Sequence, residues 1–182
     1  MATHRVVLTY EDYAAMPDDG RRYEIHEGEL SVTPVPGVPH QEIVGNLYIL
    51  LRQHVDARAL GKVLVAPVDV ILATTSIVQP DVVYIETARL TVVSGRGIEG
   101  PPSLAVEVIS PSTPAIDRKT KLQLYARYRV PYYWIADPAM RAVDAYELAD
   151  DVYRLVMRAS GTMLVALPPF PDMRFAPDSL WP

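Results

Sequence analysis

Residues 104–110 read LAVEVIS, and residues 79–86 read QPDVVYIE. Both are short runs of aliphatic and β-branched residues, a composition typical of strands buried on both faces of a sheet. Each run also carries an acid, since Glu107 lies between two valines and Asp81 follows Pro80. Burying a carboxylate without a partner is costly, so a metal ion, a basic group or a proton must accompany it. These two runs therefore predict an acidic site inside a sheet.

Each acid also has an ordinary interpretation. Glu107 could form a buried ion pair or face solvent at the end of its strand, and an Asp after Pro commonly opens a strand by bonding to nearby backbone. Side-chain alternation places Asp81 on the same face as Val83 and Ile85. Two acids in neighbouring buried strands favour a functional site over two separate structural roles.

A lysine completes the set. Residues 115–129 predict a helix, and one of its faces combines polar and apolar residues: Asp117, Lys121, Leu124, Tyr125 and Tyr128. Because the apolar side of a helix packs on the sheet, Lys121 is expected to point inward and Lys119 outward. The alternatives for Lys121 are an ion pair with Asp117 or a side chain that extends out of the core to solvent.

Two carboxylates and a lysine suit metal-assisted hydrolysis. Mg²⁺ prefers hard oxygen ligands and retains several waters, so Asp81, Glu107 and the Val108 carbonyl are the predicted ligands, with Mn²⁺ as a substitute. The metal lowers the pKa of a bound water, and Lys121 would orient that water or stabilise the charge of the transition state.

The rest of the chain predicts a single α/β domain over residues 1–182, with a mixed sheet flanked by helices and a core at about 40–137. A short helix at 10–16 and a hairpin within 21–34, turning at Glu27–Gly28, come first. The next elements are a helix at 40–57, strands at 62–67 and 68–73, a mobile loop at 91–102 and a strand at 130–137. A hairpin turning at 149–151 and a surface tail of about twenty residues end the chain.

Composition excludes several classes of protein. The chain has no cysteine, which rules out disulfides and thiolate zinc sites, and no apolar run long enough to span a membrane. The first residues lack the pattern of a signal peptide, so a cytoplasmic location is expected. The net charge is −5, yet residues 117–129 alone carry +4. Any binding of phosphate is expected to use this segment.

Six stretches carry a family resemblance: YEIHEGEL (23–30), PHQEIVGNL (39–47), QPDVV (79–83), VEVISPST (106–113), DRKTKLQLY (117–125) and VPYYWIADP (130–138). Together they resemble the Uma-type family of restriction endonucleases, a branch of the PD-(D/E)XK nuclease superfamily. The resemblance implies a restriction-endonuclease-like fold and a Mg²⁺-dependent nuclease, with Asp81 and Glu107 as the two motif acids. Ile109 stands where the superfamily has its lysine, and the family is similar in moving that lysine to the following helix, which fits Lys121.

Four other residues are candidates of second rank. Glu24 and Asp69 could reach the metal or simply be ordinary strand residues, and Gln79 could lie near the site. His40 could contact phosphate at the start of its helix or have a structural role there. Asp117 joins them as the possible partner of Lys121.

The predicted function is a DNA endonuclease, and a homodimer is expected because enzymes that cut both strands are often two-fold symmetric. One alternative is a nuclease fold that is weakly active or inactive and serves as a binding module for nucleic acid or protein. Another is a metal-dependent hydrolase that acts on smaller molecules.

Overall fold

The structure, a computed structural model, describes residues 6–110 and 115–182, so the start of the chain and the end of the VEVISPST stretch lie outside it. The mixed α/β architecture with helices flanking a sheet is confirmed. The strands form two six-stranded sheets, however, and not the single sheet that was expected. No helix in the described ranges is long and apolar enough to cross a membrane.

The central sheet contains both acid-bearing runs.

 Its strands are β3 (Gly61–Val65), β6 (Val82–Glu86), β9 (Leu104–Val108), β10 (Tyr132–Asp137), β11 (Ala142–Ala149) and β12 (Val152–Ser160), in the order β12-β11-β10-β9-β6-β3. Strands β9 and β10 are parallel, and the other neighbours are antiparallel. The two acid-bearing runs, β6 and β9, are therefore neighbours, and neither is an edge strand of the sheet.

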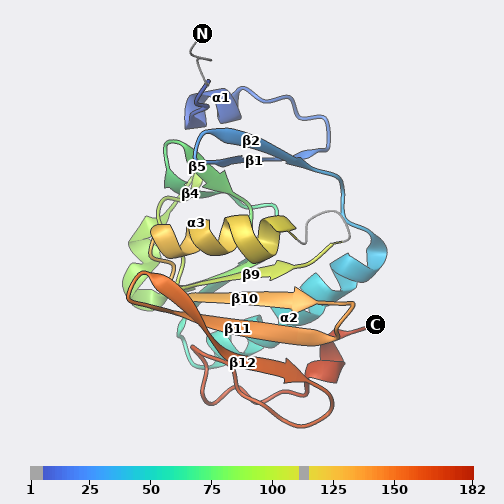
Figure 1. Ribbon diagram of the computed structural model, residues 1–182. Helices are drawn as coiled ribbons and strands as arrows, with labels where there is room; N and C mark the ends of the chain where they lie inside the picture. Colours follow the sequence, from blue (N-terminus) through green and yellow to red (C-terminus); the bar gives the residue numbers. More distant parts are fainter. Residues whose placement is uncertain (1–5, 111–114) are drawn as a thin grey trace.

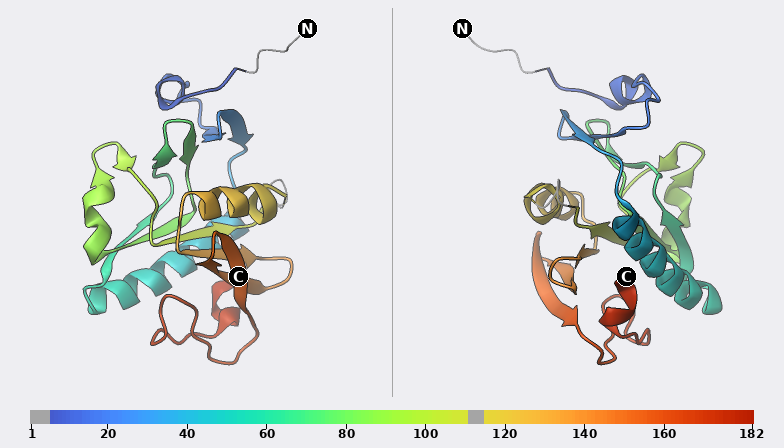
Figure 2. Two further views of the ribbon diagram at one scale, coloured as in Figure 1. Left: turned by 60° about the vertical axis from the view of Figure 1, so that its left-hand side comes forward. Right: turned by 90° about the vertical axis from the view of Figure 1, so that its right-hand side faces the viewer.

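Two helical segments cover opposite faces of this sheet, as Figures 1 and 2 show. Helix α2 (Val38–Ala57) begins two residues before the predicted start and packs on one face through residues such as Leu47 and Leu51. The other face is covered by η2 (Ile116–Lys121), a π-helical segment, which continues into α3 (Leu122–Arg127). The predicted helix at 115–129 is thus present, but its first part is wound more widely than an α-helix.

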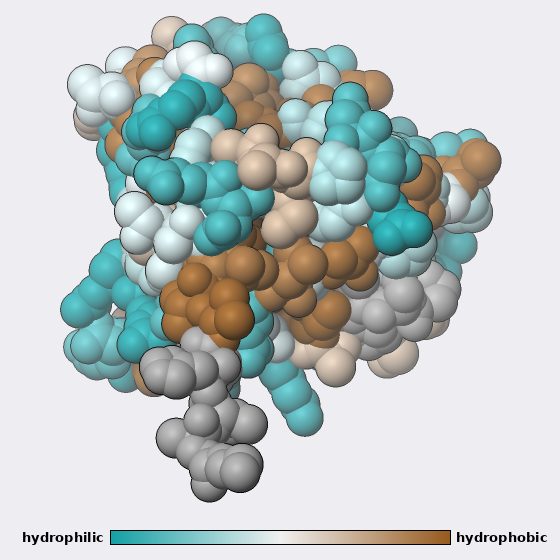
Figure 3. Space-filling view, turned by 90° about the horizontal axis from the view of Figure 1, so that it is seen from above, coloured by the Kyte–Doolittle hydropathy of each residue, from teal (hydrophilic) through white to brown (hydrophobic). Residues whose placement is uncertain are grey.

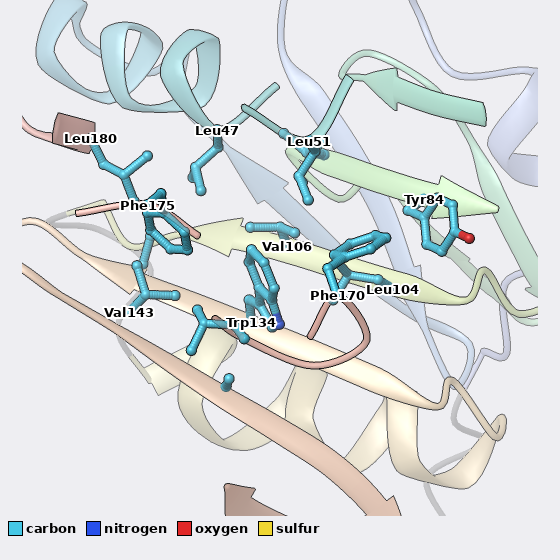
Figure 4. Close-up of a cluster of buried hydrophobic side chains, with 14 of the residues drawn as sticks. Leu47, Leu51, Tyr84, Leu104, Val106, Trp134, Val143, Phe170, Phe175 and Leu180 are labelled. Carbon is cyan, nitrogen blue, oxygen red and sulfur yellow. The ribbon is translucent and has the colours of Figure 1, made fainter. Parts of the chain in front are cut away.

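The C-terminal segment is part of the core, so the prediction of a surface tail was wrong. Phe170, Phe175 and Leu180 are buried beside Trp134, together with the 3-10 helix η3 (Pro177–Leu180) (Figure 4). The indole N–H of Trp134 also donates a 2.7 Å hydrogen bond to the Pro168 carbonyl. The physical reason is that α2 covers only part of this face of the sheet, since it packs on β3, β6 and β9. The apolar side chains of β10 and β11 on the same face are covered by the C-terminal segment.

The second sheet was not anticipated. It contains β1 (Arg22–His26), β2 (Glu29–Thr33), β4 (Val70–Ala73), β5 (Ser76–Val78), β7 (Val93–Ser94) and β8 (Gly97–Ile98), in the order β2-β1-β5-β4-β8-β7. The segment 91–102, expected to be a mobile loop, forms β7 and β8 after the 3-10 helix η1 (Thr87–Val92). Pairing of Ile25 in β1 with Ile77 in β5 ties the first hairpin to the strands that precede β6.

The N-terminal elements match their predicted order. Helix α1 (Tyr10–Ala14) is shorter than expected, and the backbone N–H of Thr9 donates to Asp12 at 2.8 Å, as a capping box requires. The β1–β2 turn has positive φ angles of 53° at Glu27 and 82° at Gly28. A β-carbon at Gly28 would also lie 2.5 Å from a methyl group of Val7, so both backbone angle and space favour glycine there.

This upper part of the molecule exposes apolar surface. Apolar atoms gather in the middle of the face seen from above (Figure 3), and Val6, Val7, Leu30 and Val32 are among the exposed apolar residues of the chain. The β1–β2 hairpin is thus buried on the side that carries Glu24 and partly exposed on the side that carries Leu30.

Candidate active site

The two predicted acids project from the same face of the central sheet. Asp81 immediately precedes β6 and Glu107 lies in β9, and the two strands are paired in a register that sets Val82 opposite Val106. Alternation puts Asp81 with Val83, and Glu107 with Ala105, on the face that packs under α3. Both acids are buried, with 3% and 2% of their surface exposed. The structure therefore brings together the acids of the two deciding runs.

At the start of β6, the Asp81 side chain accepts a hydrogen bond from the backbone of the neighbouring strand β9. Its Oδ2 accepts a 2.8 Å hydrogen bond from the N–H of Val108, and its Oδ1 accepts one of 3.0 Å from Nη1 of Arg22. Burial raises the pKa of Asp81. The neighbouring His40, Arg22 and Val108 N–H lower it by more, so the net shift of the pKa is downward. Because the N–H and C=O of one strand residue point to the same side, the Val108 carbonyl is expected on the side of β9 that faces β6.

Lys121 reaches the acids from the overlying helical segment. Its Nζ lies 2.8 Å from Oε1 of Glu107, 3.1 Å from Oε1 of Glu24 and 3.9 Å from Oδ1 of Asp117. Lys121 is buried and Lys119 is exposed, as the helical-face pattern predicts. The pair with Asp117 exists, but it is the longest of the three contacts.

Glu107 accepts two hydrogen bonds in the site, and its neighbours shift its pKa in opposite directions. Its Oε1 accepts hydrogen bonds of 2.8 Å from both Lys121 and the hydroxyl of Tyr125. Burial is the largest influence and raises the pKa of Glu107 to about 8, although the charge of Lys121 lowers it; the charges of Asp81 and Asp117 add to the rise. Without a further cation, Glu107 therefore holds a proton at neutral pH.

Glu24 is buried in the site, so its alternative role as an exposed strand residue is excluded. It accepts from Lys121, from the backbone N–H of Gln79 at 2.7 Å, and lies 3.1 Å from Nε2 of His26. Burial raises the pKa of Glu24, but the Lys121 charge and the contacts with His26 and Arg22 lower it overall. Glu24 is thus an ionised carboxylate held against Lys121.

Gln79 contacts Glu24 through its backbone and Asp69 through its side chain, outside the cavity. The Gln79 side chain donates to Oδ1 of Asp69 at 2.8 Å, and Tyr13 donates to the same oxygen at 2.6 Å. Asp69 does not line the cavity that contains the two acids, whereas Gln79 reaches Glu24 only through its backbone. These two residues support the site and do not face it.

A cavity of about 170 Å³ joins these groups. Its polar lining includes the side chains Arg22, Glu24, His40, Asp81, Glu107, Asp117 and Lys121. Arg22 was not among the predicted site residues. The available signal was alternation, because Arg22 and Glu24 are two residues apart in one strand and therefore share a face.

The charges of the cavity fit a divalent cation. Four buried carboxylates (Glu24, Asp81, Glu107 and Asp117) face two permanent cations, Arg22 and Lys121, which leaves a charge of −2 when every acid is ionised. In the described part of the chain, no three His, Asp or Glu side chains are grouped as a complete metal cage. Two carboxylates, a backbone carbonyl and waters suit Mg²⁺, which usually keeps much of its hydration shell.

A comparison with known families identifies the family of this chain. The chain matches the family model Uma2, described as "Putative restriction endonuclease", over residues 10–178. It belongs to the Uma2 family. The matched range contains every residue of the cavity, from the first hairpin to the helical segment that carries Lys121.

One solved structure shows the same fold as this Uma2 member. It is a crystal structure described as a "putative nuclease belonging to DUF820" from Anabaena variabilis, with a TM-score of 0.78 and 16% sequence identity. The alignment covers 95% of this chain and 97% of that one. A comparison with curated proteins finds no match. The similarity therefore establishes the fold over nearly the whole chain.

The raised pKa of Glu107 predicts how pH affects the metal-free protein. The folded state keeps a proton on Glu107 up to a pH of about 8, whereas the ordinary value is 4.5. Proton binding to Glu107 therefore favours the folded state. This contribution to the free energy of unfolding is complete below the ordinary pKa and is lost as the pH rises through the pKa of the folded state. In EDTA, the free energy of unfolding should fall by at most about 1.4 kcal/mol per pH unit between about pH 6 and 8.

The matched control is Glu107→Gln, which keeps the shape and removes the titration. Denaturant unfolding of both proteins across this pH range isolates the contribution of Glu107, since the other groups are shared. We expect the wild-type curve to fall relative to that of the variant. Parallel curves would show that Glu107 is already ionised in the folded state.

Proposed function

We propose that this protein is a divalent-metal-dependent endonuclease that hydrolyses phosphodiester bonds of DNA. The observation that carries the proposal is the convergence of Asp81 and Glu107 on one face of adjacent strands, with Lys121 2.8 Å from Glu107. Membership of a family described as restriction endonucleases supports the same reaction class. Mg²⁺ is the proposed natural ion, and Mn²⁺ is expected to replace it.

Asp81, Glu107 and the Val108 carbonyl are the proposed ligands of the ion. When bound, it supplies a water of lowered pKa and shields the negative charge of the phosphate. Asp81 is already ionised and is anchored by the Val108 N–H, so its carboxylate is oriented before an ion arrives. To bind the ion, Glu107 would have to lose its proton. The affinity for the metal should therefore increase as the pH rises.

Lys121 is the proposed charge-stabilising residue. Glu107 and Glu24 fix its ammonium group from two sides, while burial excludes competing water. The residue two positions after Glu107 is Ile109, which points to the same face of β9 but carries no charge. Lys121 therefore supplies, from the helix above, the cation that β9 itself lacks. There it can orient the attacking water or stabilise the negative transition state.

The main rival is a nuclease fold that binds nucleic acid or protein with little or no catalysis. The net charge of −5 favours this rival, because phosphate binding needs clustered cations. The basic segment 117–129 supplies few of them, since Arg118, Arg127 and Arg129 are ion-paired with acids and Lys121 is buried, which leaves Lys119 as its exposed cation without an ion pair among the described residues. Substrate affinity must then come from within the cavity or from groups outside this segment.

A plasmid-nicking assay separates the two functions. Purified protein is incubated with supercoiled plasmid in Mg²⁺, in Mn²⁺ and in EDTA. The proposed function predicts open-circular product with either metal and none with EDTA. Binding of DNA without conversion in either metal would favour the binding module. Turnover of small phosphodiesters without plasmid cleavage would favour a hydrolase of smaller substrates.

Light scattering of the active sample tests the proposed homodimer.

A further inference from the structure

Arg22 enters the cavity with most of its hydrogen-bonding capacity unused. It extends from β1, and only its Nη1 is engaged, by Oδ1 of Asp81 at 3.0 Å. Its Nε and Nη2 are buried and have no hydrogen-bond partner among the described residues. Buried donors of a charged group are nearly always satisfied, because leaving them unpaired costs more than an ordinary hydrogen bond contributes. The structure thus holds a cation with an unfilled binding edge.

The geometry of that edge selects its ligand. The Nε–H and one N–H of Nη2 lie on the same side of the planar guanidinium group and point in parallel. Such a fork matches two oxygens of a phosphate or a carboxylate, and the resulting charge-assisted pair is stronger than neutral hydrogen bonds. A carboxylate of this chain already occupies Nη1, so the open edge remains for an incoming anion.

His40 presents further unpartnered groups to the same cavity. Both of its ring nitrogens are buried without a hydrogen-bond partner among the described residues, and Nε2 lies 3.5 Å from Oδ1 of Asp81. Arg22 and His40 provide four of the five such buried side-chain atoms in the described part of the chain. His40 and Gly37 also bring the N-terminus of the twenty-residue helix α2 to the cavity, an end that favours negative charge.

Other cations near the site are already committed. Lys121 is held by Glu107 and Glu24, and Arg118 is bound to Asp137 and Asp144. Four carboxylates line the cavity, so an anion can enter only where a cation has donors to spare. Arg22 is the cavity-lining cation with donors that lack a partner in the described residues.

We propose that Arg22, assisted by His40, binds the phosphate of the substrate through Nε and Nη2. The inference rests on the proposed function and adds to it a residue that contacts two non-bridging oxygens of the phosphodiester. Arg22 would thereby connect the substrate to Asp81, since Nη1 of the same guanidinium holds that carboxylate. The substrate phosphate is placed beside the acids by a residue of the first hairpin.

The test compares Arg22→Lys with Arg21→Lys. The first variant keeps the charge beside Asp81 but loses the two-pronged edge, and the second alters the neighbouring arginine, whose side chain is 66% exposed. Thermal unfolding in EDTA first establishes that both variants are folded. Inorganic phosphate is then titrated into each protein by calorimetry, in Mg²⁺ and in EDTA.

We expect Arg22→Lys to bind phosphate at least about 10-fold more weakly than wild type and Arg21→Lys to bind it unchanged, in line with the loss of a charge-assisted pair. In plasmid cleavage, Arg22→Lys should raise KM more than it lowers kcat, because the phosphate contact exists before the reaction. Equal phosphate affinity in wild type and Arg22→Lys, or no phosphate binding by wild type in either condition, would overturn the inference.

The two proposals fail separately. If wild type binds phosphate through Arg22 but cleaves no nucleic acid, the phosphate site stands and the endonuclease does not. If wild type cleaves DNA while Arg22→Lys retains both KM and phosphate affinity, the endonuclease stands and the role of Arg22 is wrong.

Discussion

Replacing Glu107 with glutamine is expected to abolish plasmid cleavage, with a loss of at least about 10³-fold in rate, while leaving the metal-free protein folded. Because Glu107 holds a proton in the absence of a cation, glutamine resembles the form already present and can still accept from Lys121 and Tyr125. What it cannot do is become an anionic ligand. The variant should therefore lose Mn²⁺ binding by calorimetry together with activity.

Asp81→Asn provides the companion measurement, since Asp81 is the other proposed ligand. It should also lose metal affinity and rate, and it should be less stable than Glu107→Gln because Asp81 is ionised and paired with Arg22 in the folded state. Wild-type activity in Glu107→Gln would mean that the cleavage came from a contaminant or from another site on the protein.

Removing Lys121 should separate metal binding from rate. Lys121→Ala is expected to retain Mn²⁺ affinity, because Lys121 is not a ligand, and to cut the cleavage rate by about 10²-fold or more, the scale for loss of a preorganised charge stabiliser. Its metal-free form should also lose about 3–5 kcal/mol of stability, because the ionised Glu24 loses its buried cationic partner. Single-turnover cleavage and calorimetry, both at saturating metal, measure the two effects.

Lys119→Ala is the matched control, since Lys119 lies two residues away in the same helical segment but is exposed. It should change rate and metal affinity little. If Lys119→Ala lost as much activity as Lys121→Ala, the assignment of the inward lysine would be wrong. If Lys121→Ala cleaved at the wild-type rate, charge stabilisation at this position would be excluded.

The centre of the fold was predictable from local patterns. Aliphatic runs interrupted by Asp81 and Glu107 indicate buried strands, and a five-residue strand is long enough for alternation to assign each acid to a face. The helical period likewise identified Lys121 as inward. These features depend on neighbours along the chain, so the sequence contains the whole signal.

The missing parts depend on partners that are distant in sequence. Strands of two or three residues, such as β5, β7 and β8, are too short for a period to be detected, and β5 pairs with β1, which lies about fifty residues earlier in the chain. The C-terminal tail resembled a loop because of its prolines, yet Phe170 and Phe175 fill the part of the sheet that α2 leaves open. Arg22 was not among the predicted site residues, because its contact with Asp81 joins two positions that lie 59 residues apart in the sequence.

A crystal soaked in Mn²⁺ shows whether Asp81 and Glu107 hold the metal, because the anomalous signal of manganese locates the ion without reference to activity. We expect a peak at about 2.1 Å from carboxylate oxygens of both Asp81 and Glu107, with the Val108 carbonyl as a third protein ligand. A saturating soak that leaves this position without a peak, or places the ion away from both acids, would contradict this expectation.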